Sequence, residues 1–403
     1  MNVEELVRDS LRDMAAEEPF VAPELADRVL GVRRRRRTRR LVAAAVATTA
    51  AMAVAVGVPL LDAGKQDVRP AHAVQPNGVH SDTEQWPPQK EIGAGGATLA
   101  AYYSLKIHKQ SAGWGLAERT YWLLDQKTGR YAKDTRWSYV AVAPGLRTAA
   151  VLERTLPAHR IGLLDLTTGE VERWIPVDRG VAGLAFSEDG RRLVATTYDK
   201  NPDLMRVGYG AKGTGVFNVM DDVSRTGFFV LDVASGEGPW SGVAADRNDT
   251  YRHDFAFSRT GEQVYARIVG ARDGMQQFYD LDGNAIAAPA DEKYLRSDVP
   301  ARLSPNGELA ALGLAKEVRP GKSYSSIRDP RTGKEITKVR GGELLAWVDD
   351  HRLIAWERTT GLDEPYRARL VVVTIGSDKV VPLSGEVEPY GQSQGWTAVF
   401  ARP

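Results

Sequence analysis

The sequence predicts an all-β domain, a β-propeller of six or alternatively seven four-stranded blades, preceded by a short helical segment and one transmembrane helix. Two turn motifs that recur at intervals of roughly 40 to 70 residues predict the blades. An uncharged apolar run directly after an arginine cluster predicts the helix. The chain has no cysteine, which excludes disulfide scaffolds, thiol catalysis and cysteine zinc sites.

Residues 1–40 are expected to form a cytoplasmic helical segment that ends in an arginine-rich stop. Apolar residues recur at helical spacing over 2–17, and a second short helix follows Pro23. Helices this short cannot bury a core of their own. Leu6, Leu11 and Leu25 therefore belong either to a disordered or membrane-surface tail, or to a docking surface that folds on a cytoplasmic partner.

Residues 41–61 contain no charged side chain and would form about 31 Å of helix, close to the thickness of one hydrocarbon core. The positive-inside rule places the arginines that precede this run in the cytoplasm and residues after 61 outside. These topology determinants are Arg33, Arg34, Arg35, Arg36, Arg37, Arg39 and Arg40. We therefore expect a single-pass protein of the cell membrane that contacts lipid through 41–61.

Residues 62–96 are predicted to be an extracytoplasmic linker, because they contain four prolines and a glycine cluster without a sustained apolar period. Within this stretch, 71–73 has the Ala-x-Ala form of a signal-peptidase site. Cleavage after Ala73 is thus an alternative to a retained anchor.

Residues 97–403 contain the two turn motifs that predict the propeller. Glycine supplies a positive φ in such turns, and an aspartate or serine at the start can accept hydrogen bonds from the following amides. The first motif, Asp followed by Gly after an apolar strand, occurs at 125–129, 165–169, 232–236, 329–333 and, shortened, at 280–283. The second, an apolar residue followed by Ser and Gly, occurs at 186–190, 257–261 and 303–307, with weaker copies at 142–145 and 347–351.

The alternating motifs divide this region into six units, which is typical of blades in radial array. The units begin near Ala97, Trp137, Val181, Arg252, Asp298 and Glu343. Residues 395–401 form an additional apolar strand, which we expect to pair with the first unit and close the ring. Seven blades are the alternative, if 384–403 and 80–100 form a blade of their own.

The two motifs resemble the bacterial WD40-like or TolB-like β-propeller repeat, whose hallmark is an FSPDG-type turn paired with a D-x-x-T-G turn. The likeness covers about 97–403, although no unit ends in the Trp-Asp pair of WD40 repeats. The whole pattern is similar to membrane-anchored proteins of actinobacterial type. Some related architectures carry an anti-sigma segment before the membrane span, which implies a sigma factor as a possible cytoplasmic regulator for residues 1–40.

No motif that carries chemistry stands in its required context, and the G-x-G-x-x-G match at 208–213 lies in an insertion instead of a strand–helix unit. No histidine pair stands at zinc-ligand spacing, and neither H-E-x-x-H nor a G-x-S-x-G elbow is present. We expect no catalytic residue, metal or cofactor. The formal net charge of +1 argues against nucleic acid as a partner. The longest insertion, around 200–225, is expected to be a rim loop that could bind a ligand through Tyr209 and Lys212.

These observations favour a binding or sensing module outside the membrane, with a protein partner or another ligand on the propeller face. One alternative is an extracytoplasmic propeller enzyme of the lyase, lactonase or glycosidase type, which would need carboxylates or a metal in the central channel. The other alternative is a structural scaffold of the cell envelope. Turn motifs specify a fold rather than an activity.

Overall fold

The computed structural model describes residues 78–111, 113–210, 213–216, 224–244, 252–268, 274–387 and 396–403. Their regular structure consists of β-strands, which confirms the all-β prediction for this part of the chain. None of these residues belongs to a helix long and apolar enough to cross a bilayer. The predicted helix at 41–61, the segment 1–40 with its arginines and leucines, and Ala73 lie outside the described residues.

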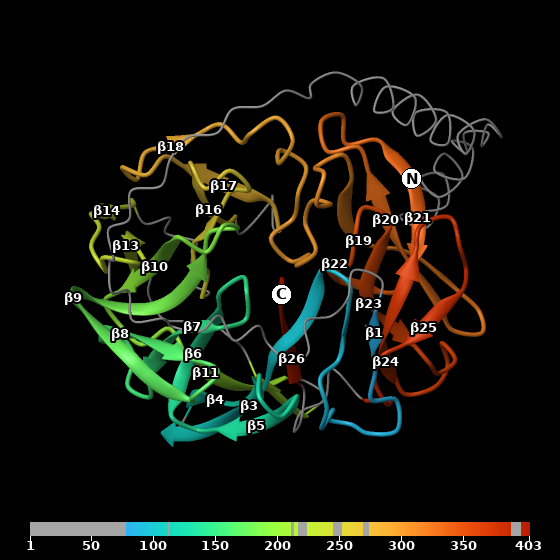
Figure 1. Cartoon of the computed structure of the whole chain (residues 1–403), viewed down its shortest axis with the longest axis horizontal. Coiled ribbons are helices and arrows are strands. Elements are labelled where there is room, and N and C mark those ends of the chain that lie inside the picture. The colour runs from blue at the N-terminus through green and yellow to red at the C-terminus, as the bar shows by residue number, and fades with distance from the viewer. Residues whose placement is uncertain are drawn as a thin grey trace, which may run out of the picture. The chain divides into compact units, whose positions relative to one another are not determined.

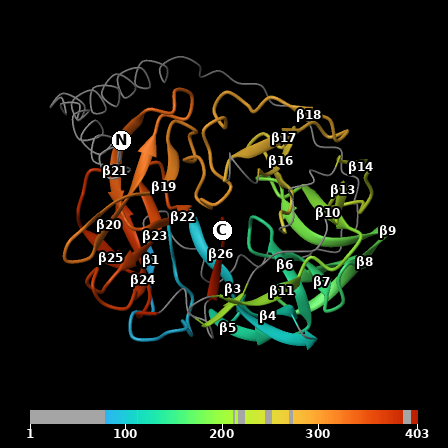
Figure 2. The same ribbon diagram turned by 180° about the vertical axis from the view of Figure 1, so that it is seen from behind.

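The strands form antiparallel sheets that stand around a common centre, which is the arrangement of a β-propeller (Figure 1). Figure 2 shows the same succession of sheets from behind. In chain order the described strands are β1 (Val79–His80), β2 (Gly93–Ala94), β3 (Ala97–Ser111), β4 (Trp114–Asp125), β5 (Arg130–Asp134), β6 (Trp137–Val142), β7 (Thr148–Glu153), β8 (Ala158–Asp165), β9 (Glu170–Phe186), β10 (Arg192–Tyr198), β11 (Leu204–Gly210), β12 (Gly213–Val216) and β13 (Arg225–Asp232). The remaining strands are β14 (Trp240–Gly242), β15 (Ala256–Phe257), β16 (Val264–Arg267), β17 (Gln276–Tyr279), β18 (Ala285–Ile286), β19 (Ala310–Val318), β20 (Lys322–Arg328), β21 (Glu335–Arg340), β22 (Glu343–Trp347), β23 (Arg352–Arg358), β24 (Ala368–Thr374), β25 (Val380–Pro382) and β26 (Trp396–Ala401).

Pairing joins the described strands into five sheets of 8, 7, 4, 3 and 4 strands. The seven-stranded sheet contains two sets that share β9, and β1, β2, β11 and β12 extend the first sheet, so the strands around the centre fall into six groups. They are β26-β3-β4-β5, β6-β7-β8-β9, β9-β10-β13-β14, β15-β16-β17-β18, β19-β20-β21 and β22-β23-β24-β25. The long strand β9 belongs to two groups, because residues 170–176 pair with β8 and residues 181–186 pair with β10. The first strands of neighbouring groups contact one another, β26 with both β6 and β22, and β9 with β15.

The ring closes through the end of the chain, as the sequence predicted. Strand β26 pairs antiparallel with β3, from Trp396 opposite Ser104 to Ala401 opposite Thr98. Aromatic rings fill the seam beside this pairing: Trp86 stacks on Trp396 with centroids 3.7 Å apart, and Trp356 meets Trp396 edge-on at 4.9 Å. The pairing joins the last strand of the described chain to its first sheet, and β26 also contacts β22 of the last group.

Part of the predicted linker is packed against the sheets. Residues 79–80 and 93–94 form β1 and β2, and β2 continues into β3. Ile92 is fully buried in the same apolar cluster as Leu99 and Leu370. The folded domain therefore begins before residue 97 within the described chain.

The repeated turns have the predicted geometry. At Asp125 the carboxylate accepts a hydrogen bond from the amide of Lys127 at 2.8 Å, and Gly129 has a φ of +62°. At Ser187 the hydroxyl accepts from the amide of Arg192 at 3.0 Å, and Gly190 has a φ of +71°. Each motif thus closes its hairpin by local bonds, independently of the rest of the ring.

Candidate functional site

The two ends of the inner strands differ, and this difference defines the candidate site. We call the first strands of neighbouring groups, which contact one another, the inner strands. Strand β6 runs from Trp137 to Val142, and the second half of β9 runs from Val181 to Phe186. Six residues of strand span about 20 Å, so the groups at the two ends do not touch.

A cavity of about 340 Å³ lies where the inner strands finish. We call it the Arg302 cavity. Its apolar wall comes from residues at or near the ends of separate strands, Val142, Phe186, Phe257 and Phe400, together with Leu303, which bridges to the start of β19. The serine turns follow these strand ends directly, and Ser187 and Ser258 of two such turns also line the space. The repeat that builds the ring therefore builds the cavity rim.

Arg302 is held from several sides. Its guanidinium forms an ion pair with Glu292, which is 2% exposed, and lies 4.0 Å above the centroid of the Tyr265 ring. Glu292 also accepts a hydrogen bond from the amide of Arg259 at 2.8 Å. The buried carboxylate is thereby neutralised, and the arginine head is fixed over an aromatic face.

The backbone of Arg302 is strained. Its φ is +48°, in the left-handed region that side chains other than glycine rarely adopt. The carbonyl of Arg302 accepts hydrogen bonds from the amide of Ala311 at 2.8 Å and from Nε1 of Trp347 at 3.4 Å. Neighbouring groups thus hold a conformation that places this side chain at the cavity.

A second ion pair stands at the cavity rim. Arg402, which directly follows β26, pairs with Glu188 in the turn after β9. Both side chains are partly exposed, so the pair is screened by solvent and contributes little to stability. It connects the end of the chain to another strand group beside the opening.

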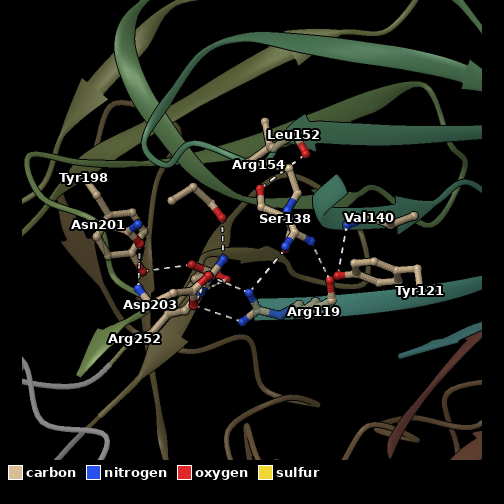
Figure 3. Close-up of polar contacts among 12 residues, drawn as sticks. Arg119, Tyr121, Ser138, Val140, Leu152, Arg154, Tyr198, Asn201, Asp203 and Arg252 are labelled. Atoms are coloured by element: carbon tan, nitrogen blue, oxygen red, sulfur yellow. Dashed lines mark hydrogen bonds and ion pairs between the residues drawn. The ribbon is translucent and has the colours of Figure 1, made fainter. Parts of the chain in front are cut away.

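An ionic network occupies the opposite end, where the inner strands begin (Figure 3). Asp203 lies between two arginines: its Oδ2 accepts from Nη1 of Arg119 at 2.6 Å, and its Oδ1 accepts from Nη1 of Arg252 at 2.6 Å. Asp203 is 4% exposed. Burial opposes ionisation of this carboxyl, but the charges of Arg252 and Arg119 and their hydrogen bonds outweigh it and lower its pKa.

Each arginine of this network also binds the start of an inner strand. Arg119 donates to the carbonyl oxygen of Ser138 in β6 at 3.3 Å, and Arg252 donates to that of Ala182 in β9. Because Arg119 lies on β4 and Arg252 precedes β15, one carboxylate connects several strand groups. We call this set, together with Asp254 and Tyr198, the Asp203 network.

Asp254 extends the network. It pairs with Nε of Arg252 at 3.1 Å and accepts a hydrogen bond from the Tyr198 hydroxyl at 2.8 Å. Burial raises the pKa of Tyr198 well above its ordinary value, which keeps the phenol a donor. A Cβ on Gly183 would lie 2.2 Å from Cγ of Asp254, so glycine is required for this approach.

Of the site residues predicted from sequence, only the backbone of Tyr209 lies within the described part of the chain. Tyr209 lies in β11, where the sequence predicted a loop, and β11 pairs with both β4 and β12. The pairing of β11 with β4 could not be predicted from local sequence, because β4 lies far away in the chain. Lys212, Leu6, Leu11, Leu25 and the seven arginines from Arg33 to Arg40 lie outside the described residues.

Sequence reasoning missed Arg302, Glu292, Asp203 and Arg119. None of them belongs to a local motif, and each acquires its role from a distant partner. Asn201-Pro202-Asp203 carried a turn signal, and the Asn201 side chain does accept a hydrogen bond from the Asp203 amide at 2.9 Å. That signal predicts a turn and says nothing of two arginines beyond it.

Metal ligands do not cluster in the described part of the chain: no group of three or more histidine, aspartate or glutamate side chains there could hold an ion. The two carboxylates of the Arg302 cavity, Glu188 and Glu292, are each paired with an arginine. The arrangement can therefore bind apolar groups and anions, and it offers charged hydrogen-bond donors at a fixed place.

The fold and the site together define a β-propeller with an ionic network at one end of its inner strands and a cavity at the other. No protein-family model matches the chain. No curated protein matches it.

Solved structures with propellers resemble the chain at low identity. TolB from Acinetobacter baumannii is 15% identical over 76% of this chain and 66% of its own, with a TM-score of 0.39. Hydrazine synthase of Kuenenia stuttgartiensis is 12% identical over 61% and 65%, with a TM-score of 0.35, so the chain spans about two thirds of each of these two proteins. The Cps50 (Swd1) β-propeller domain of Myceliophthora thermophila is 12% identical over 71% and 98%, with a TM-score of 0.31. Similarity at this level does not extend to function.

Proposed function

We propose that the chain is a membrane-anchored binding propeller whose Arg302 cavity takes a ligand outside the membrane. The observation that carries this proposal is the cavity of about 340 Å³ at the ends of the inner strands, within the size range of small-molecule sites. Aromatic walls with a few fixed charged groups are typical of such sites.

The proposal includes binding without catalysis. Both carboxylates of the cavity are engaged with arginines, Glu292 with Arg302 and Glu188 with Arg402. A general acid or base needs a carboxyl group free to exchange a proton with its substrate. We also interpret the six strand groups as six blades, because β26 joins the group of β3.

The anchor and the signal remain part of the proposal. The apolar run at 41–61 after the arginines supports a single-pass topology with residues 1–40 in the cytoplasm. Ligand binding outside would then be reported to a cytoplasmic regulator, for which a sigma factor is our candidate, through the surface that carries Leu6, Leu11 and Leu25.

A comparison of two purified full-length proteins tests ligand binding. Ala401 lines the cavity, so Ala401→Trp fills it. We expect mass spectrometry of small molecules extracted from the wild-type protein to show at least one compound that the Ala401→Trp protein lacks. Identical extracts from the two proteins would contradict the proposal.

The membrane topology has a separate test. Because the chain has no cysteine, a single introduced cysteine is the only thiol that can be labelled. Asp363 is 74% exposed, and Asp363→Cys should react with a membrane-impermeant maleimide on intact cells. Ser10→Cys should react only after permeabilisation. Labelling of Ser10→Cys on intact cells, or failure to label Asp363→Cys, would overturn the orientation. Crosslinking of a transcription regulator to residues 1–40, lost in a Leu6, Leu11 and Leu25 triple aspartate variant, tests the signalling part.

A further inference from the structure

The Arg302 head retains hydrogen-bonding capacity. Its Nη2 donates to Glu292, whereas Nη1 is buried and has no acceptor among the described residues. A guanidinium carries five N–H donors, and a buried donor without an acceptor is unfavourable. Because Nη1 is covered, an oxygen in the cavity would supply the missing acceptor after a small rotation of the guanidinium toward it.

The charges around the cavity favour an anion as the source of that oxygen. Arg259, Arg302 and Arg402 line it together with Glu188 and Glu292, so the lining carries one net positive charge. Nη2 of Arg259 donates a hydrogen bond to the carbonyl oxygen of Pro305 at 2.9 Å, and this acceptor is neutral. Each carboxylate of the lining has an arginine beside it, which offsets its repulsion of an anion.

The walls require an apolar body on the same ligand. Phe186, Phe257 and Phe400 line the cavity from three strand groups. The volume of about 340 Å³ lies at the lower end of the range for small-molecule sites. It matches a compact organic molecule better than a folded partner, which would need a much larger contact area.

We propose that the Arg302 cavity binds a small organic carboxylate with a flat or aliphatic apolar body, and that Arg302 receives the carboxylate. This inference rests on the proposed function and names the ligand class of the same cavity. The strained backbone of Arg302 supports it, because strain of this kind persists where neighbouring groups fix a functional side chain. The ion pair with Glu292 and the Tyr265 ring then set the direction from which the ligand approaches.

The test compares acids with their own amides, which differ in charge and hardly in shape. The probes are 3-phenylpropanoate, indole-3-acetate and octanoate, each beside its primary amide, titrated into the full chain by isothermal calorimetry at pH 7.5. We expect at least one acid to bind ten-fold more tightly than its amide. Partition into the solubilising detergent favours the neutral amide, so it cannot produce this preference.

Two variants localise the effect. Arg302→Gln should remove the preference for the acid while amide binding stays within two-fold, and Ala401→Trp should abolish binding of both probes. Arg319→Gln is the matched control, since Arg319 is 74% exposed, is paired with Asp363, and does not line the cavity. It should behave as wild type. Circular dichroism melts establish that all three variants are folded. If Arg302→Gln unfolds, Arg302→Lys, which keeps the charge, replaces it. Arg302→Lys should retain binding, with the preference for the acid reduced at least three-fold.

Either of two results would overturn the inference: no acid binds more tightly than its amide, or the Arg302 variant shows the same preference for the acid as wild type. A compound that copurifies with the wild-type protein and not with Ala401→Trp, and that carries no carboxylate, would also refute the ligand class. In that last case the binding function itself would stand, so the two failures are distinguishable.

Discussion

The two ends of the inner strands use the same residue types to opposite effect. At the start of the strands, the single carboxylate of Asp203 bridges Arg119 and Arg252, and both arginines also bind strand carbonyls. At the finish, Arg302 and Arg402 each have a glutamate of their own, and a cavity remains between them. A shared counter-ion draws strand groups together, whereas separate pairs leave room for a ligand.

The largest effect is expected from Asp203→Asn. The substitution leaves Arg119 and Arg252 buried beside a neutral amide, and removal of one partner of a buried ion pair costs about 3–5 kcal/mol. Urea unfolding followed by tryptophan fluorescence measures the loss in the free energy of unfolding. Asp363→Asn is the control, because its ion pair with Arg319 is exposed and is worth about 0–1 kcal/mol. Equal losses in the two variants would refute the structural role of the network.

The next largest effect is expected on the pH dependence of the free energy of unfolding. Because the folded-state pKa of Asp203 is lowered below its unfolded value of about 3.9, its contribution to stability is present above that unfolded pKa. The contribution disappears as the pH falls through the lowered folded pKa. We therefore expect the stability difference between wild type and Asp203→Asn to shrink as the pH decreases below about 4. A difference that stays constant down to pH 2 would mean that Asp203 is not the ionised centre of the network.

A smaller effect is expected at the other end. Phe400 lies partly exposed at the cavity, and Phe400→Ala should lower the free energy of unfolding by about 1 kcal/mol. Phe255 is fully buried near the start of β15, and Phe255→Ala should cost about 3–5 kcal/mol. Thermal melts of the two variants compare the ends directly. A cost at Phe400 equal to that at Phe255 would show that the cavity wall is as closely packed as the core.

Features encoded by neighbouring residues were predictable from the sequence. Asp125 and Gly129 specify their turn within five residues, and the apolar period of 395–401 identified the closing strand β26. The Asp203 network was not predictable, because its arginines and carboxylates come together only when distant strand groups meet. Trp86 lies in a stretch with many turn residues, and only the folded ring shows that it stacks on Trp396.

The smallest change in stability is expected from Ala401→Trp. This substitution tests most directly whether the two ends of the inner strands differ in the space that they leave. Because Ala401 lines a cavity of about 340 Å³, the indole has room and the free energy of unfolding should change by no more than about 0.5 kcal/mol. Ala182 is its counterpart at the start of an inner strand, where it is fully buried and its carbonyl accepts from Arg252. Ala182→Trp overpacks that end and should cost at least about 1–3 kcal/mol. Urea unfolding of both variants gives the two values side by side. Because an indole is accepted only where space already exists, a similar cost at both positions would mean that the two ends are equally closed.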